Sequence, residues 1–169
     1  NKLEWGGVKG VSFMINLVST LLYTVNYYIV APTANSYAIH LGTNGAFGST
    51  LIGASSLAAL FAALFYSLWY SKLSFKSALV VSSIAPLVGD LMYAVALSLQ
   101  SMRIALLGRI LVGFGSAEVV NRQLISACVH YNHMTKASVA FVLAGAVGMS
   151  VGPLLAAILD GWAGRDFQA

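Results

Sequence analysis

The sequence predicts an all-α membrane protein, a bundle of helices that cross a lipid bilayer. Of its 169 residues, 59% are hydrophobic and only 8% are charged, and its mean hydropathy is +0.82. A soluble domain carries roughly a quarter of charged residues, so this chain has too little polar surface for a soluble fold. Its apolar residues form long runs and do not alternate with polar ones, which excludes the strand pattern of a transmembrane barrel.

Five segments are long enough to cross a bilayer as helices. A span needs about 20 mostly apolar residues, because the hydrocarbon layer is about 30 Å thick and each helical residue rises about 1.5 Å. The connectors between the segments are short, so we expect successive helices to run antiparallel. The predicted spans are residues 11–32, 46–70, 77–98, 104–128 and 137–159.

Lysine and arginine in the loops predict the orientation of these helices, because basic residues in short loops favour the cytoplasmic side. Loops on one side carry five basic residues and loops on the other side carry two. The five are Lys2, Lys9, Lys72, Lys76 and Lys136, and the two are Arg103 and Arg165. We therefore expect the amino terminus in the cytoplasm. The formal net charge of +4 fits this orientation signal, and we expect no nucleic-acid partner.

Asp90 in the third span and Arg109 in the fourth are predicted to lie at nearly the same depth. Each charge in a bilayer is a candidate for function, because lipid disfavours it. Either the two residues form a static ion pair that holds their helices together, or Arg109 faces a central cavity where Asp90 and a substrate anion compete for it. Arginine suits an oxyanion such as phosphate, since its planar fork donates two hydrogen bonds at once.

Glu118 and Arg122 are the other charged residues of the fourth span. Their i, i+4 spacing places them on one helix face, about opposite the face of Arg109. Arg122 is predicted close to the cytoplasmic surface, where its long side chain reaches water. Glu118 lies deeper and is a candidate proton carrier that would couple transport to protons.

Small residues form motifs in the fourth and fifth spans. Arg109 is followed by Gly113 and Gly115, and the fifth span contains Gly148, Gly152 and Pro153. Small side chains let helices approach closely in lipid, and a proline removes a backbone donor and kinks its helix. The two motifs resemble those of the fourth and fifth helices of the major facilitator superfamily. This resemblance implies a major facilitator-type bundle, with five of the six amino-terminal helices in this sequence and no soluble domain.

The chain further resembles the transporter portion of the SPX-domain major facilitator family, the vacuolar phosphate transporters. The matching stretches are residues 26–34, 106–109, 115–117, 120–126 and 148–153. In that family a soluble SPX domain, which senses inositol pyrophosphates, precedes the membrane part. The resemblance implies a secondary transporter that carries inorganic phosphate across the vacuolar or lysosomal membrane by alternating access. Its partners would be phosphate or a similar anion, the bilayer, the remainder of the transporter, and inositol pyrophosphate through an SPX domain outside this sequence.

Tyr23, Asn26 and Tyr27 form a polar stripe on the first span, because they are spaced i, i+3 and i+4. The first and fourth helices of the superfamily line the substrate path, so the resemblance implies that these residues and Arg109 bind the substrate. The alternative is that the tyrosines belong to a belt at the membrane surface, which leaves Asn26 unexplained.

Other functions have less support in the sequence. His130 and His133 have no third metal ligand nearby, and no nucleophile–base set is visible, so we expect neither a cofactor nor an enzyme. Two alternatives stay open besides phosphate transport. The protein is either a carrier of another organic or inorganic anion, of the lysosomal type, or a membrane receptor that transports nothing.

Overall fold

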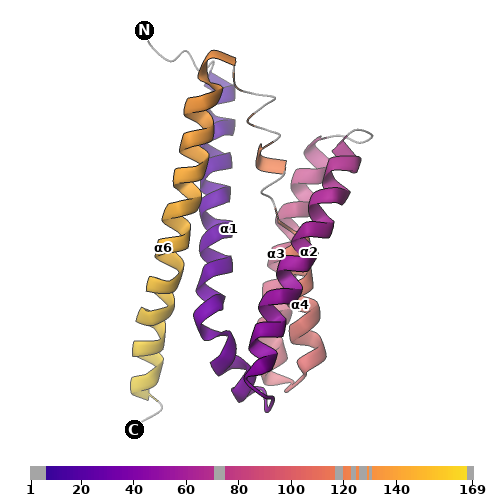
Figure 1. The fold of residues 1–169 in the computed structure, drawn as a ribbon, viewed down its shortest axis with the longest axis vertical. Coiled ribbons are helices and arrows are strands. Elements are labelled where there is room, and N and C mark those ends of the chain that lie inside the picture. The colour runs from indigo at the N-terminus through magenta and orange to yellow at the C-terminus, as the bar shows by residue number, and fades with distance from the viewer. Residues whose placement is uncertain are drawn as a thin grey trace. The chain divides into compact units, whose positions relative to one another are not determined.

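The protein is described by a computed structural model that covers residues 7–70, 75–116, 120–122, 125, 129 and 131–166. These residues form helices and connecting turns and include no strand, which confirms the all-α prediction. The helices are α1 (Gly7–His40), α2 (Ala46–Tyr70), α3 (Phe75–Ser98), α4 (Met102–Phe114) and α6 (Met134–Asp166), with a 3-10 turn η1 (Tyr131–His133) before α6 (Figure 1).

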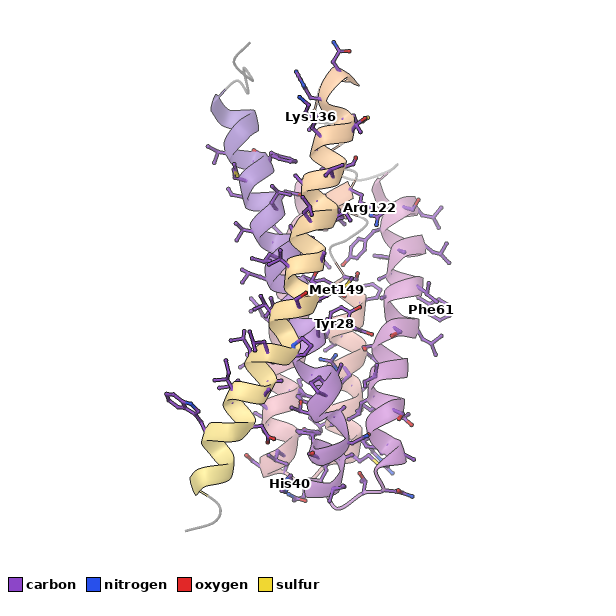
Figure 2. All side chains as sticks on the ribbon, turned by 60° about the vertical axis from the view of Figure 1, so that its left-hand side comes forward. Tyr28, His40, Phe61, Arg122, Lys136 and Met149 are labelled. Atoms are coloured by element: carbon purple, nitrogen blue, oxygen red, sulfur yellow. The ribbon has the colours of Figure 1, made fainter. Side chains whose placement is uncertain are left out.

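Four helices of the described part are long and apolar enough to cross a membrane. The segments are Gly10–His40, Ala46–Leu68, Val80–Ser98 and Met134–Trp162. Large apolar side chains project from them into the surroundings, as Phe61 does on α2, where it is 69% exposed (Figure 2). Apolar surface of this extent is stable in lipid and not in water, which confirms that this is an α-helical membrane protein.

The chain forms two compact units, and helix α1 contributes to both. The first unit comprises Asn1–Val30 and Asn121–Ala169, and the second comprises Ala31–Val120. Each unit has its own buried clusters, and each is described by itself below.

In the first unit, the amino-terminal part of α1 packs in parallel with α6 (Figure 1). A Cβ atom on Gly148 would lie 2.8 Å from Cβ of Thr24, and one on Gly152 would lie 2.8 Å from Cβ of Tyr28. The two glycines therefore let α6 approach α1 more closely than any side chain would permit. Pro153 follows within α6 and is exposed. A buried apolar cluster completes the unit, formed by Phe13, Ile125, Val129, Ala137 and Phe141.

In the second unit, α2 and α3 both pack against α4. The closest approach of α3 and α4 is at Gly89 and Gly108, where a Cβ atom on Gly89 would lie 2.6 Å from the carbonyl oxygen of Gly108. On the α2 side, a Cβ atom on Gly113 would clash with the carbonyl oxygen of Ser55. Glycine thus brings two neighbouring backbones into direct contact with α4.

The predicted fourth span, residues 104–128, is wrong as a continuous helix. Helix α4 ends at Phe114, Gly115 forms a turn, and Ser116 has no regular structure, although Val120–Arg122 are again helical. The amide of Gly115 donates to the carbonyl of Leu111 at 2.9 Å and that of Ser116 to the carbonyl of Gly113 at 3.0 Å, which tightens the last turn. Closely spaced glycines favour a helix end here, and Gly115 lies so close to the ring of Pro86 that a Cβ atom would clash with it.

Helix α1 is longer than its predicted span, residues 11–32, because it continues through Pro32 to His40. A proline in a membrane helix removes one backbone hydrogen bond, which the rest of the helix tolerates. The helix ends at His40, and Gly42, two residues later, has a φ of 75°. The amide of Gly42 donates to Ile39 and that of Thr43 donates to Ala38, the Schellman pattern that closes a helix with glycine in the left-handed region.

Candidate functional site

Arg109 is the most deeply buried charged residue of the described part of the second unit. It lies in the middle of α4 and is 1% exposed. Its Nε and Nη1 atoms have no hydrogen-bond partner among the described residues. A buried cation with unused donors is costly in a protein interior, so these donors require an explanation.

The contact between α3 and α4 determines those surroundings. Gly108, the residue before Arg109, packs against the backbone of α3, because a Cβ atom there would lie 2.7 Å from the carbonyl oxygen of Gly89 and 3.0 Å from the amide nitrogen of Tyr93. The guanidinium carbon of Arg109 lies 5.6 Å from the centre of the Tyr93 ring. This is within the range of a cation–π interaction, which partly compensates for the loss of water around the charge.

Asp90 directly follows Gly89 within α3, so it lies at the level of the same helix contact. Its side chain is half-buried. The close approach of Gly89 to Gly108 agrees with the depth at which the sequence places the two charged residues. The ion pair between Asp90 and Arg109 stays a prediction.

Tyr37 and Tyr93 complete the cluster around Arg109, and the sequence analysis missed both. Their rings are stacked with centres 4.1 Å apart and planes 17° apart. The hydroxyl of Tyr37 donates a hydrogen bond of 2.7 Å to the backbone carbonyl of Tyr93, whereas the hydroxyl of Tyr93 is buried and has no partner among the described residues. One signal could have revealed Tyr93, because its i, i+3 spacing from Asp90 places both on one helix face.

The predicted polar stripe, Tyr23, Asn26 and Tyr27, lies in the first unit, where all three side chains are half-buried. The ring of Tyr27 packs edge-on against that of Tyr28, with centres 5.3 Å apart. Because Arg109 belongs to the second unit, a shared substrate path for the stripe and Arg109 stays a prediction.

Arg122 is exposed, and its guanidinium carbon lies 5.6 Å from the centre of the Phe141 ring. Its predicted position at the membrane surface, where the side chain would reach water, stays a prediction. Glu118, the candidate proton carrier, lies outside the described residues.

The first unit contains a buried polar network that the sequence analysis also missed. The side-chain amide of Asn121 donates to the hydroxyl of Thr20 at 3.0 Å, and that of Asn16 donates to the backbone carbonyl of Asn121 at 3.2 Å. The Thr20 hydroxyl in turn donates to the carbonyl of Asn16 at 2.9 Å. All three side chains are buried, so the network links α1 to the segment at Asn121.

Comparison with known proteins identifies relatives of the chain. No family model matches it, and no solved structure matches it. It is 43% identical over 157 residues, 93% of the chain, to an SPX domain-containing membrane protein of Arabidopsis thaliana. It is 45% identical over 150 residues, 89% of the chain, to one of Oryza sativa subsp. indica.

This chain is a relative of the SPX domain-containing membrane proteins. It spans only about a fifth of their length, 22% of the Arabidopsis protein and 21% of the rice protein. The names of these SPX domain-containing membrane proteins agree with the four apolar helices of the structure on a membrane location. They also support the SPX part of the resemblance seen in the sequence.

Proposed function

We propose that the protein is a secondary transporter of inorganic phosphate, or of a similar anion, in the vacuolar membrane. It moves the anion unchanged by alternating access, in which helical bundles rock around a central site. The loop charges favour a cytoplasmic amino terminus. An SPX domain elsewhere in the relatives suggests regulation by inositol pyrophosphate, as the resemblance implies.

One observation carries the proposal, the buried guanidinium of Arg109, whose Nε and Nη1 atoms have no hydrogen-bond partner in the part of the chain that the structure describes. A structural arginine in a membrane bundle normally has its donors paired, because unpaired polar groups in an apolar interior are costly. A guanidinium with unused donors fits an oxyanion, because hydrogen bonds between a charged donor and an anionic oxygen are strong. An enzyme acting on the anion would need further reactive groups, whereas a carrier needs only to bind the anion.

The test is phosphate counterflow in proteoliposomes that are loaded with unlabelled phosphate and contain the full-length transporter, this chain together with the remainder of the protein. We expect radiolabelled phosphate to accumulate with the wild type and not with Arg109→Gln. The matched control is Arg103→Gln, on the same helix but exposed, which should retain uptake. Size-exclusion chromatography checks that each variant remains folded.

Three results would contradict the proposal. If the protein took up an unrelated anion but no phosphate, it would be a carrier of that other anion. No uptake by the wild type would favour a receptor. Equal uptake by Arg109→Gln and Arg103→Gln would exclude Arg109 from the site.

A further inference from the structure

Two neighbouring side chains of the second unit each have a buried polar group without a hydrogen-bond partner among the residues that the structure describes. One is the guanidinium of Arg109, through its Nε and Nη1 atoms, and the other is the hydroxyl of Tyr93. The guanidinium carbon is 5.6 Å from the centre of the ring that carries this hydroxyl. Unsatisfied groups are rare among buried side chains, so two together call for an explanation.

The Tyr93 ring is held in one position by its neighbours. Tyr37 stacks on it at 4.1 Å and bonds the backbone carbonyl of the same residue at 2.7 Å. The backbone of Gly108 also packs against the backbone amide of Tyr93. A phenol fixed in this way keeps its ring beside Arg109 before any ligand arrives, which lowers the entropic cost of binding.

We propose that Tyr93 is a second ligand of the anion site at Arg109, and that the pair selects compact oxyanions such as phosphate and arsenate. The inference rests on the proposed function and deepens it by assigning the substrate class. Arg109 donates an N–H to one oxygen of the anion, and Tyr93 donates its O–H to another oxygen. Tyr37 is a positioning residue that holds Tyr93 and does not touch the anion.

The preference for compact anions follows from how the groups are enclosed. Arg109 is 1% exposed, and the backbones of α3 and α4 touch directly beside it at Gly89 and Gly108. An organic substituent on the anion would need space that the two helices fill, so it would have to push α3 away from α4. A tetrahedral oxyanion offers oxygens in several directions and can meet both groups at once, whereas a halide offers a single acceptor centre.

Phosphate counterflow, measured over a range of phosphate concentrations, tests the assignment of Tyr93. Tyr93→Phe keeps the ring and its stacking on Tyr37 and removes only the hydroxyl. We expect the phosphate concentration at half-maximal uptake to rise roughly tenfold or more, as for loss of a hydrogen bond to a charged group, with maximal uptake retained. The matched control is Tyr66→Phe, which also removes a buried hydroxyl without a partner but from a ring packed on Phe65 and Phe114.

Competition with unlabelled anions tests the substrate class in the same vesicles. Arsenate should compete with phosphate, and glycerol phosphate and chloride should not. An unchanged half-maximal concentration in Tyr93→Phe, an equal rise in Tyr66→Phe, or equal competition by glycerol phosphate would each overturn the inference. If Arg109→Gln abolishes uptake while Tyr93→Phe changes nothing, the proposed function stands and only the role of Tyr93 fails. If the wild type takes up no phosphate, both fail.

Discussion

Gly89 of α3 and Gly108 of α4 face each other, and each occupies the space that a side chain on the other would need. A Cβ atom on Gly89 would lie 2.6 Å from the carbonyl oxygen of Gly108, and one on Gly108 would lie 2.7 Å from that of Gly89. The atoms in the way are backbone and cannot rotate aside. The contact therefore determines how close Arg109, directly after Gly108, lies to α3.

Gly89→Ala should destabilise the second unit, because its methyl group would push α3 away from α4. Overpacking of this kind costs about 1–3 kcal/mol, and we expect the melting temperature in detergent to fall by several degrees. Gly53→Ala on α2 is the control, since a Cβ atom there meets nothing within 4 Å. A melting temperature of Gly89→Ala equal to that of Gly53→Ala would show that the two helices separate without cost.

Phosphate uptake by Gly89→Ala gives a second measurement. If the α3–α4 contact positions Arg109 beside Tyr93, uptake should fall more than the loss of folded protein explains. Normal uptake per folded molecule would show that the anion site does not depend on this contact.

The sequence analysis predicted close helix packing at glycines but not which helices meet. Gly113 and Gly115 were singled out because small residues pack well in lipid. Their partners, Ser55 on α2 and Pro86 on α3, come from distant parts of the chain. Periodicity and composition report on one helix at a time, so pairing between helices had to come from the structure.

The helix ends show where local signals were sufficient and where they were outweighed. Gly42 marks the end of α1, and this signal is readable in the sequence, whereas Pro32 lies inside the helix and does not end it. The end of α4 at Phe114 depends both on local glycines and on the ring of Pro86 beside Gly115. The second of these causes is a tertiary contact, which no pattern in the fourth span reveals.

In the cluster around Arg109, one residue was predictable from the sequence and two were not. A charged residue in an apolar span is visible in the sequence, and Arg109 is a candidate for that reason. The role of Tyr93 depends on the unpaired state of its hydroxyl, and that of Tyr37 depends on a bond between α1 and α3. Neither property is encoded in residue type or spacing.

Gln100 should be replaceable by glycine with a gain in stability. It has a φ of 48° and follows α3 as Gly42 follows α1, with the amide of Ser101 bonded to the carbonyl of Ala96 at 3.1 Å. The left-handed region costs a residue with a side chain roughly 1–2 kcal/mol. We expect Gln100→Gly to raise the melting temperature by a few degrees, since its exposed side-chain bond to Leu97 contributes little.

Gly42→Ala and Gly45→Ala are the controls for this prediction. Gly42 has a φ of 75°, so alanine there should lower the melting temperature by a similar amount. Gly45 is free of contacts within 4 Å and has no left-handed φ, so alanine there should change little. A loss of stability in Gln100→Gly would mean that the glutamine side chain contributes more than its backbone strain costs.

Gly148 and Gly145 on α6 provide a matched comparison in the first unit. A Cβ atom on Gly148 would meet Thr24 and Leu21 of α1, whereas one on Gly145 would meet nothing within 4 Å. Gly148→Ala should therefore lower the melting temperature, and Gly145→Ala should leave it unchanged or raise it, because alanine favours helix by about 1 kcal/mol. Equal effects of the two substitutions would exclude close packing of α6 on α1 at this position.

Thr20→Val should weaken the link between α1 and the segment at Asn121. Valine preserves the shape of threonine but removes the hydroxyl that accepts the 3.0 Å hydrogen bond from the Asn121 side chain. The amide donor of Asn121 is then left buried without its partner, which costs about 1–3 kcal/mol.

The best control is Thr24→Val on the same helix. Thr24 is also buried, but its hydroxyl is bonded at 2.7 Å to the carbonyl of Thr20, within its own helix. Both substitutions lose one bond of that kind, and only Thr20→Val also breaks the bond to Asn121. Chemical unfolding in detergent micelles should show a larger loss of unfolding free energy for Thr20→Val, by about 1 kcal/mol, the upper part of the range for side-chain bonds between membrane helices. Equal losses would mean that the Asn121 amide finds another acceptor and that the network does not hold the unit together.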